Sequence, residues 1–133
     1  MPISHITLRR GYSAEYLEAI SQGLQQALVT TFDVPEEDCF QIFHSMEAGA
    51  MRGHPHYLTS GRGEDWLLIE ITAGKPRSPQ LKRALYRDLA ARFAANPGLA
   101  SGELMVVIRH NAAEDWSFGD GLASMLPIIE EEI

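Results

Sequence analysis

The sequence predicts an α/β (α+β) fold, in which a tandem β-α-β repeat forms a four-stranded sheet with two helices on one face. Three observations support this fold class. The length of 133 residues suits a single domain over residues 1–133. An apolar fraction of 45% allows a packed core. A weak internal repeat, with a period of roughly 65 residues, gives both halves the same order of strand-like and helix-like segments.

The first repeat covers about residues 1–46. Residues 2–8 are apolar and β-branched, which favours a strand. Ser13 is suited to cap a helix, because its hydroxyl can accept a hydrogen bond from a free amide of the first turn. The next segment has one apolar stripe at helical spacing, formed by Tyr16, Leu17, Ile20, Leu24, Ala27 and Leu28. Breaker residues 33–35 end this helix, and residues 39–46 are predicted to form the closing strand.

The second repeat covers about residues 66–110 and has the same plan. Residues 66–73 favour a strand. Ser78, followed by a proline, predicts the start of a helix. That helix has a second apolar stripe, formed by Leu81, Leu85, Leu89 and Phe93. It ends at the breaker residues 96–98, and residues 104–110 are predicted to form the last strand.

The strands within each repeat should be parallel and joined by a right-handed crossover. We interpret residues 47–65, with several Gly and His, as the linker between the repeats, and residues 111–133 as a C-terminal segment. Two helices on one face leave the other face of the sheet bare. We expect that face to be apolar and to be covered by self-association, which predicts an oligomer.

Composition excludes several classes of function. The net charge of -7 disfavours nucleic acid as a partner. No apolar run is long enough for a membrane span, and the N-terminus does not have the pattern of a signal peptide. The single cysteine, Cys39, cannot form an internal disulfide, so we expect a cytoplasmic protein in which Cys39 is a small core residue. His54 and His56 lack the Cys or Asp cluster that would indicate a metal site.

Pro2 is the first residue that could carry chemistry. Removal of Met1 would expose a secondary amine at the start of a strand. An α-amino group titrates near about pH 8, which is within reach of acid–base catalysis at neutral pH. Met-Pro is also a common start without functional meaning, and Pro2 cannot titrate while Met1 remains attached.

Three other segments could contribute to a site. Lys75-Pro76-Arg77 lies between a strand end and a helix start, where two cations and the helix N-terminus favour a carboxylate. Asp38 precedes a predicted strand and could orient a water or a substrate hydroxyl. Trp116 and Phe118, two residues apart, could wall a small pocket. Each segment also has an ordinary interpretation, as solvated charges, an acidic loop or a hydrophobic plug.

Taken together, these features resemble the malonate semialdehyde decarboxylase group of the tautomerase superfamily. The resemblance runs from Pro2 to about Met125, and its most specific stretch is 111–121. It implies a homotrimer that needs no metal and no organic cofactor and acts on a small carboxylate. It also implies that Pro2 acts as a cationic acid, that Asp38 assists it, and that Arg77 binds the substrate carboxylate. The matching aromatic residues of the pocket wall are Trp116 and Phe118.

Two residues depart from this pattern, and both touch the expected substrate pocket. Lys75 stands where the group has an arginine, which keeps the charge but loses the planar fork that binds a carboxylate through two hydrogen bonds. Met125 stands where the decarboxylase has a phenylalanine. These changes leave the exact substrate open.

Three hypotheses of function follow. The first is decarboxylation of a small 3-oxo acid, with Pro2 as a cationic acid and a possible hydratase activity at the same site. The second is keto–enol tautomerisation of a 2-oxo acid of the phenylpyruvate or 4-oxalocrotonate type, with neutral Pro2 as the base. The third is a trimeric binding protein that has kept the fold and lost the chemistry.

Overall fold

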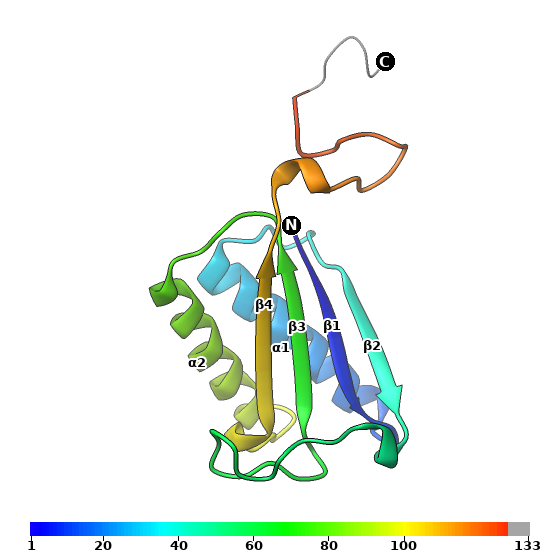
Figure 1. Cartoon of the computed structure of the whole chain (residues 1–133), viewed down its shortest axis with the longest axis vertical. Coiled ribbons are helices and arrows are strands. Elements are labelled where there is room, and N and C mark those ends of the chain that lie inside the picture. Colours follow the sequence, from blue (N-terminus) through cyan, green and yellow to red (C-terminus); the bar gives the residue numbers. More distant parts are fainter. Residues whose placement is uncertain (128–133) are drawn as a thin grey trace.

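Four strands form one sheet that is backed by two helices in the structure, a computed structural model that describes residues 1–127 (Figure 1). The strand order is β2-β1-β3-β4. The elements are β1 (Pro2–Arg9), α1 (Ala14–Phe32), β2 (Gln41–Met46), β3 (Leu67–Ala73), α2 (Pro79–Ala95) and β4 (Leu104–His110).

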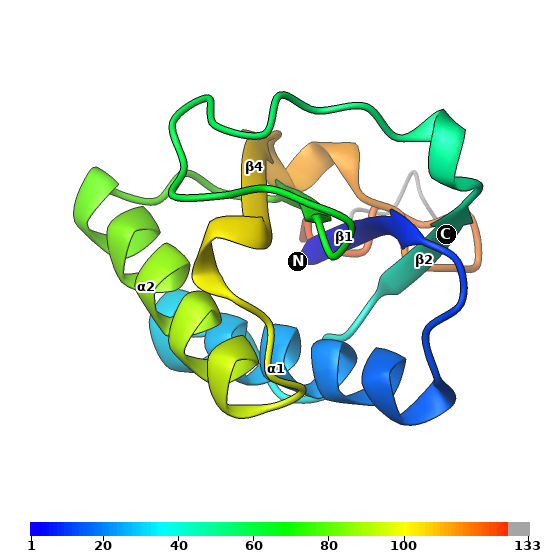
Figure 2. The same cartoon turned by 90° about the horizontal axis from the view of Figure 1, so that it is seen from below.

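The pairing of the strands confirms the predicted repeat. β1 and β2 are parallel, and so are β3 and β4, while the central pair β1–β3 is antiparallel. Both helices lie on the same side of the sheet (Figure 2). The two β-α-β units therefore join edge to edge through β1 and β3, and each contributes one helix to the same layer.

Both helices begin at the predicted caps. The Ser13 hydroxyl accepts from the amide of Tyr16 at 3.1 Å, and the Ser78 hydroxyl accepts from the amide of Leu81 at 3.2 Å. One residue of the second stripe departs from the prediction, because the Leu81 side chain is 42% exposed. It lies in the first turn of α2, whereas the buried residues of this helix are Leu85, Leu89 and Phe93.

The core lies between the helices and the sheet. Burial alternates along β1 and β3, so every second side chain points toward the helices. Fully buried aliphatic and aromatic side chains from all these elements form one cluster, which includes Ile6, Leu8, Ile20, Leu24, Leu28, Ile69, Ile71, Leu85, Leu89 and Phe93.

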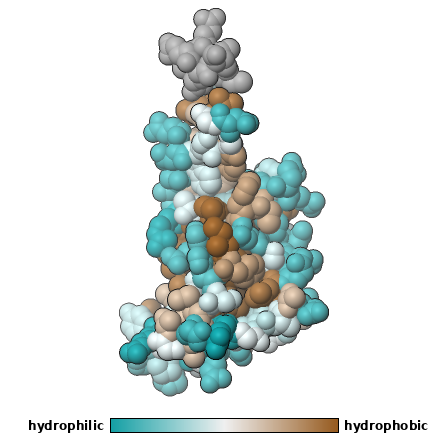
Figure 3. Space-filling view, turned by 90° about the vertical axis from the view of Figure 1, so that its right-hand side faces the viewer, coloured by the Kyte–Doolittle hydropathy of each residue, from teal (hydrophilic) through white to brown (hydrophobic). Residues whose placement is uncertain are grey.

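The opposite face of the sheet is mixed, which corrects the expectation of an apolar face. Its centre holds a hollow of about 450 Å³ lined by His5, Thr7, His44, Met46, Glu70, Thr72 and Arg109. The His5 and His44 rings are stacked, with Nδ1 and Nε2 at 2.7 Å. Glu70 pairs with Arg109 at 3.1 Å. Exposed apolar side chains on the strands include Ile42 and Met105. On the side of the molecule where β2 forms the edge of the sheet, apolar groups lie beside hydrophilic ones (Figure 3).

The linker 47–65 is tied to the end of the sheet by hydrogen bonds. The Arg9 guanidinium donates to the carbonyls of Gly63 at 3.0 Å and Met51 at 3.2 Å. The Glu103 carboxylate accepts from the amides of Gly63 and Asp65. Within residues 1–127, no helix is long and apolar enough to cross a membrane.

Gly23 of α1 packs against the Phe93 ring of α2, which gives a prediction for stability. A Cβ atom on Gly23 would lie 2.8 Å from Cε1 of Phe93, a buried ring. Gly→Ala within a helix normally stabilises by up to about 1 kcal/mol, but overpacking costs about 1–3 kcal/mol. We therefore expect Gly23→Ala to lower the free energy of unfolding by about 1–2 kcal/mol in urea titrations. Gln26→Ala, on the exposed side of α1, is the control and should change it by less than about 0.5 kcal/mol; a stabilised Gly23→Ala would contradict the packing argument.

Candidate functional site

The N-terminus lies at the end of the sheet where β3 finishes. Pro2 is paired with Ala73, the last residue of β3. The amide of Gly74 donates to the Met1 carbonyl at 3.2 Å. Met1 is present in this chain, so the nitrogen of Pro2 is an amide and the terminal ammonium belongs to Met1. The pairing brings this terminus next to the segment that leads into Lys75-Pro76-Arg77.

Asp38 faces the N-terminal nitrogen. The Met1 ammonium donates to Oδ2 of Asp38, and both side chains are only 15% exposed. The other carboxylate oxygen, Oδ1, is buried and has no hydrogen-bond partner among the described residues. A buried oxygen of this kind is costly unless a donor arrives. The site therefore holds a negative charge against the terminus and keeps one acceptor free.

A buried glutamine holds Asp38 in place. Gln25 is one of the few buried polar residues of the described core. Its side-chain amide donates to the carbonyls of Pro35, Glu36 and Asp38 at 3.2–3.4 Å. This turn also explains why β2 begins at Gln41, two residues later than predicted. Cys39 lies in the same turn and is exposed, so the expectation of a core cysteine was wrong.

Trp116 and Phe118 form an aromatic wall at the same end. Their rings are stacked, with centroids 5.5 Å apart, and the ring centroids of Phe118 and Phe40 are 5.4 Å apart. A Cβ atom built on Gly74 would lie 2.9 Å from the indole nitrogen of Trp116 and 2.7 Å from Cε of Met1. The indole edge, the Met1 side chain and Gly74 therefore meet at one point beside the terminus.

The cationic turn is anchored by the Lys75 carbonyl. This oxygen accepts from His110 Nδ1 at 3.1 Å and from the Arg77 guanidinium at 3.0 Å. Arg77 also donates to the Phe32 carbonyl at 3.1 Å and stacks over the Phe32 ring. Its cation therefore sits at the C-terminus of α1, where a positive charge is favourable. Burial lowers the pKa of Arg77, although a guanidinium stays charged near neutral pH.

Among the predicted site residues, Pro2, Asp38, Trp116 and Phe118 lie around the terminus. Arg77 and Lys75 belong to the adjoining turn, with Lys75 exposed. Met125 is 42% exposed and lies on the C-terminal segment, which projects beyond the end of the sheet in Figure 1.

Sequence reasoning missed Gln25, Gly74 and Phe40. A polar residue inside the apolar stripe of α1 was the signal for Gln25. Gly74 and Phe40 are sequence neighbours of predicted residues. Their contacts with Trp116 and Phe118 join distant parts of the chain, so no signal in the sequence pointed to them.

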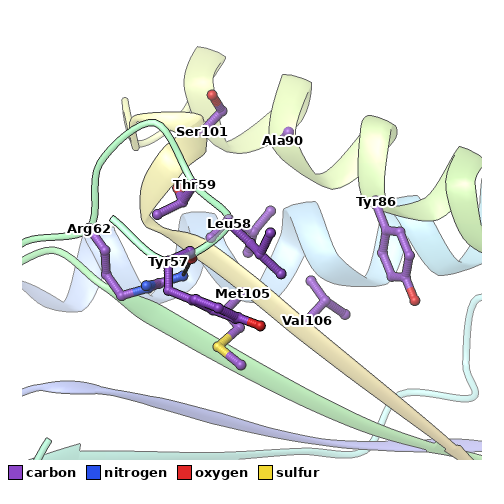
Figure 4. A pocket seen from close by; sticks show the side chains of 10 residues that line it. Tyr57, Leu58, Thr59, Arg62, Tyr86, Ala90, Ser101, Met105 and Val106 are labelled. Carbon is purple, nitrogen blue, oxygen red and sulfur yellow. Dashed lines mark hydrogen bonds between the residues drawn. The ribbon is translucent and has the colours of Figure 1, made fainter. Parts of the chain in front are cut away.

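A second cavity, of about 410 Å³, lies near the start of β4 and contains none of the predicted site residues (Figure 4). The linker supplies Tyr57, Leu58, Thr59 and Arg62, and α2 supplies Tyr86 and Ala90. Since it lies at the opposite end of β4 from His110, it is separate from the N-terminal site.

Comparison with known protein families and proteins identifies the family of this chain. Two sequence profiles, each described as "Tautomerase enzyme", match residues 38–119 and residues 2–60. The chain belongs to the tautomerase superfamily. It is 33% identical over 126 residues to "Probable tautomerase YusQ" of Bacillus subtilis (strain 168), a match that covers 95% of this chain and 99% of the relative.

Two solved structures extend the comparison of this tautomerase-superfamily chain. A malonate semialdehyde decarboxylase superposes with a TM-score of 0.87 at 25% identity, covering 92% of this chain and 95% of that one. A fused 4-OT, described as a symmetric trimer, superposes with a TM-score of 0.71 at 21% identity, covering 92% and 96%. The second match shows the fold alone.

Cys39 reports on the charge of its neighbour Asp38. Desolvation and the Asp38 carboxylate both raise the pKa of the Cys39 thiol. We expect Asp38→Asn to lower that pKa and to speed alkylation by iodoacetamide at pH 8 about two- to threefold, because more thiolate is present. Glu37→Gln, a neutralised carboxylate in the same turn, is the matched control and should change the rate little. An unchanged rate in Asp38→Asn would mean that the Asp38 carboxylate does not raise the pKa of the Cys39 thiol.

Proposed function

We propose that the chain, once Met1 is removed, is a cofactor-free decarboxylase of a small 3-oxo acid, with malonate semialdehyde as the first candidate. Pro2 is the catalytic acid, and Asp38 assists it. The observation that carries this proposal is the Asp38 carboxylate, which accepts from the ammonium of Met1, the residue directly before Pro2. A negative charge at that position stabilises a cationic nitrogen, and decarboxylation needs the cationic form.

The unpartnered oxygen of Asp38 supports the same assignment. Removal of Met1 takes away the ammonium that Asp38 now binds, and the new terminus begins one residue later, at Pro2. In the present chain Oδ2 binds the Met1 ammonium and Oδ1 has no partner among the described residues. In the processed chain a protonated secondary amine or a bound water would supply donors to these oxygens. With water held by Asp38, the same site could also hydrate an acetylenic acid.

The reaction proceeds in one proton transfer and one bond cleavage. The Pro2 ammonium donates its proton to the carbonyl oxygen of the substrate. The bond between the carboxylate carbon and its neighbour breaks, its electron pair forms the C=C bond of the enol, and CO2 leaves. Placing a cation where negative charge develops lowers the barrier. The enol then becomes the aldehyde, and Pro2 recovers a proton from water.

Arg77 and Lys75 bind the substrate carboxylate in this proposal. Two N–H groups of the Arg77 guanidinium donate to the carbonyls of Phe32 and Lys75. A guanidinium has five N–H donors, so the substrate carboxylate would accept from the remaining ones. Trp116, Phe118 and Met125 line the apolar side of the pocket, which keeps water from the departing CO2.

The comparisons support a decarboxylase, since the matching structure at 25% identity is a malonate semialdehyde decarboxylase with decarboxylase and hydratase activities. We further propose a homotrimer, as in the fused 4-OT. Exposed apolar side chains on the C-terminal segment, including Phe118, Leu122, Met125 and Leu126, favour cover by a second subunit. A single cysteine is compatible with the cytoplasm.

Keto–enol tautomerisation is the second candidate, because the Bacillus subtilis relative at 33% identity is named a probable tautomerase. That chemistry needs a neutral Pro2 that removes a proton from the carbon beside a carbonyl. Decarboxylation and tautomerisation would use the same site, and they require different charges on the nitrogen of Pro2 before the substrate binds.

A panel of three substrates separates the candidates: malonate semialdehyde, phenylpyruvate and a 2-hydroxydienoate. Wild type should convert malonate semialdehyde with the highest kcat/KM, and Pro2→Ala should lower that value at least about 100-fold, because the secondary amine is lost. The intact mass of the untagged protein should show that Met1 has been removed. A retained Met1, or full activity in Pro2→Ala, would favour a non-catalytic or proline-independent protein.

The pH profile gives an independent prediction. If Pro2 acts as a cation, kcat/KM falls as pH rises through the titration of that amine; a neutral base gives the opposite slope. Asp38→Asn removes a negative charge beside the terminus and should move the midpoint of the profile to lower pH. Glu36→Gln, an exposed carboxylate of the same loop, is the control and should leave the midpoint in place. A rising profile in wild type would overturn the decarboxylase proposal.

A further inference from the structure

Asn111 forms a side-chain hydrogen bond with Trp116 of the aromatic wall. Its side-chain oxygen accepts from the indole N–H of Trp116 at 2.6 Å. An indole N–H can only donate, and it loses free energy when it is shielded from water without an acceptor. Trp116 is partly buried. The bond therefore favours one orientation of the indole ring.

The backbone of Asn111 is fixed to the same end of the sheet as the N-terminus. Its amide donates to the carbonyl of Ala73 at 2.9 Å, and Ala73 is the residue paired with Pro2. Asn111 is therefore a rigid connection between the strand that holds the terminus and the ring that covers it.

The chain between Asn111 and Trp116 adds a second restraint. The Asp115 carboxylate accepts from the amide of Ala112 at 2.8 Å, and the Asp115 amide donates to the Ala112 carbonyl at 3.0 Å. This short turn limits the movement of the backbone before Trp116. The indole is thus held at its backbone by the turn and at its N–H by Asn111.

The indole edge and the Met1 side chain both lie close to Gly74. A methyl group on Gly74 would lie 2.9 Å from the indole nitrogen, 2.9 Å from Sδ of Met1 and 2.7 Å from Cε of Met1. The thioether of Met1 therefore lies beside both Gly74 and the indole nitrogen of Trp116. Removal of Met1 vacates the space of this side chain next to Pro2.

We propose that Asn111 is a positioning residue, which holds the indole of Trp116 beside Gly74 so that the space vacated by the Met1 side chain accepts a small substrate next to Pro2. This inference rests on the proposed function for the identity of the occupant. The orientation of Trp116 can be measured without any substrate. Asn111 acts through Trp116. The position of the Phe118 ring depends on Trp116 as well, because this ring stacks on the indole.

Fluorescence of Trp116 tests the orientation directly. The chain has two tryptophans, so Trp66→Phe in the full-length protein leaves Trp116 as the only emitter. In this background Asn111→Leu removes the acceptor at similar size, and Asn111→Asp keeps an acceptor oxygen. We expect acrylamide quenching of Trp116 to rise about two- to threefold in Asn111→Leu and to stay near the wild-type value in Asn111→Asp. Equal quenching in both variants overturns the proposal.

Kinetics supply the second readout. Asn111→Leu should raise KM for the converted substrate about tenfold, with kcat changed less than about twofold, and Asn111→Asp should restore KM. In a double-mutant cycle, Trp116→Phe should remove the effect of Asn111→Leu, because no N–H is left to hold. Additive effects in this cycle overturn the proposal.

Two further outcomes keep the test decisive. If Asn111→Leu does not fold, Asn111→Ser replaces it, since the serine hydroxyl is too short to reach the indole. If wild type converts no substrate of the panel, the proposed function fails, while the difference in quenching between the Asn111 variants still supports or overturns the positioning role.

Discussion

The antiparallel pairing of β1 with β3 is the constraint on which the rest of the structure depends. Each β-α-β unit alone provides only two parallel strands and one helix. The central pair joins the units into one sheet, so that Ile6 and Ile69 enter the same core. The same register sets Pro2 opposite Ala73. Backbone hydrogen bonds therefore place the N-terminus beside Gly74 and the cationic turn.

Polar groups that would be costly inside a protein instead organise the site. Gln25 interrupts the apolar stripe of α1, and its amide satisfies carbonyls of the turn that carries Asp38. Buried polar groups are retained where they are hydrogen-bonded. Asp38 has one buried oxygen without a partner in the described residues, and such an oxygen gains free energy when a donor binds to it.

The choice between acid and base chemistry depends on the charge around one nitrogen. Asp38 lies against the terminus, whereas the Arg77 cation is turned toward the Phe32 carbonyl at the end of α1. The charged group that contacts the Met1 ammonium is therefore a carboxylate, and a negative charge favours the protonated form of an amine. The open face of the sheet also carries polar groups, among them the stacked pair of His5 and His44.

The sequence by itself determined the repeat, the helix caps at Ser13 and Ser78, and the candidate residues Pro2, Asp38 and Trp116. These depend on local hydrogen bonding and on the period of apolar residues, which neighbouring residues specify. Tertiary structure alone decided that Arg77 faces Phe32, that Cys39 is exposed, and that Gly74, Asn111 and Trp116 meet. Those contacts join residues far apart in the chain, and their geometry is set by strand register and packing, which no local pattern encodes.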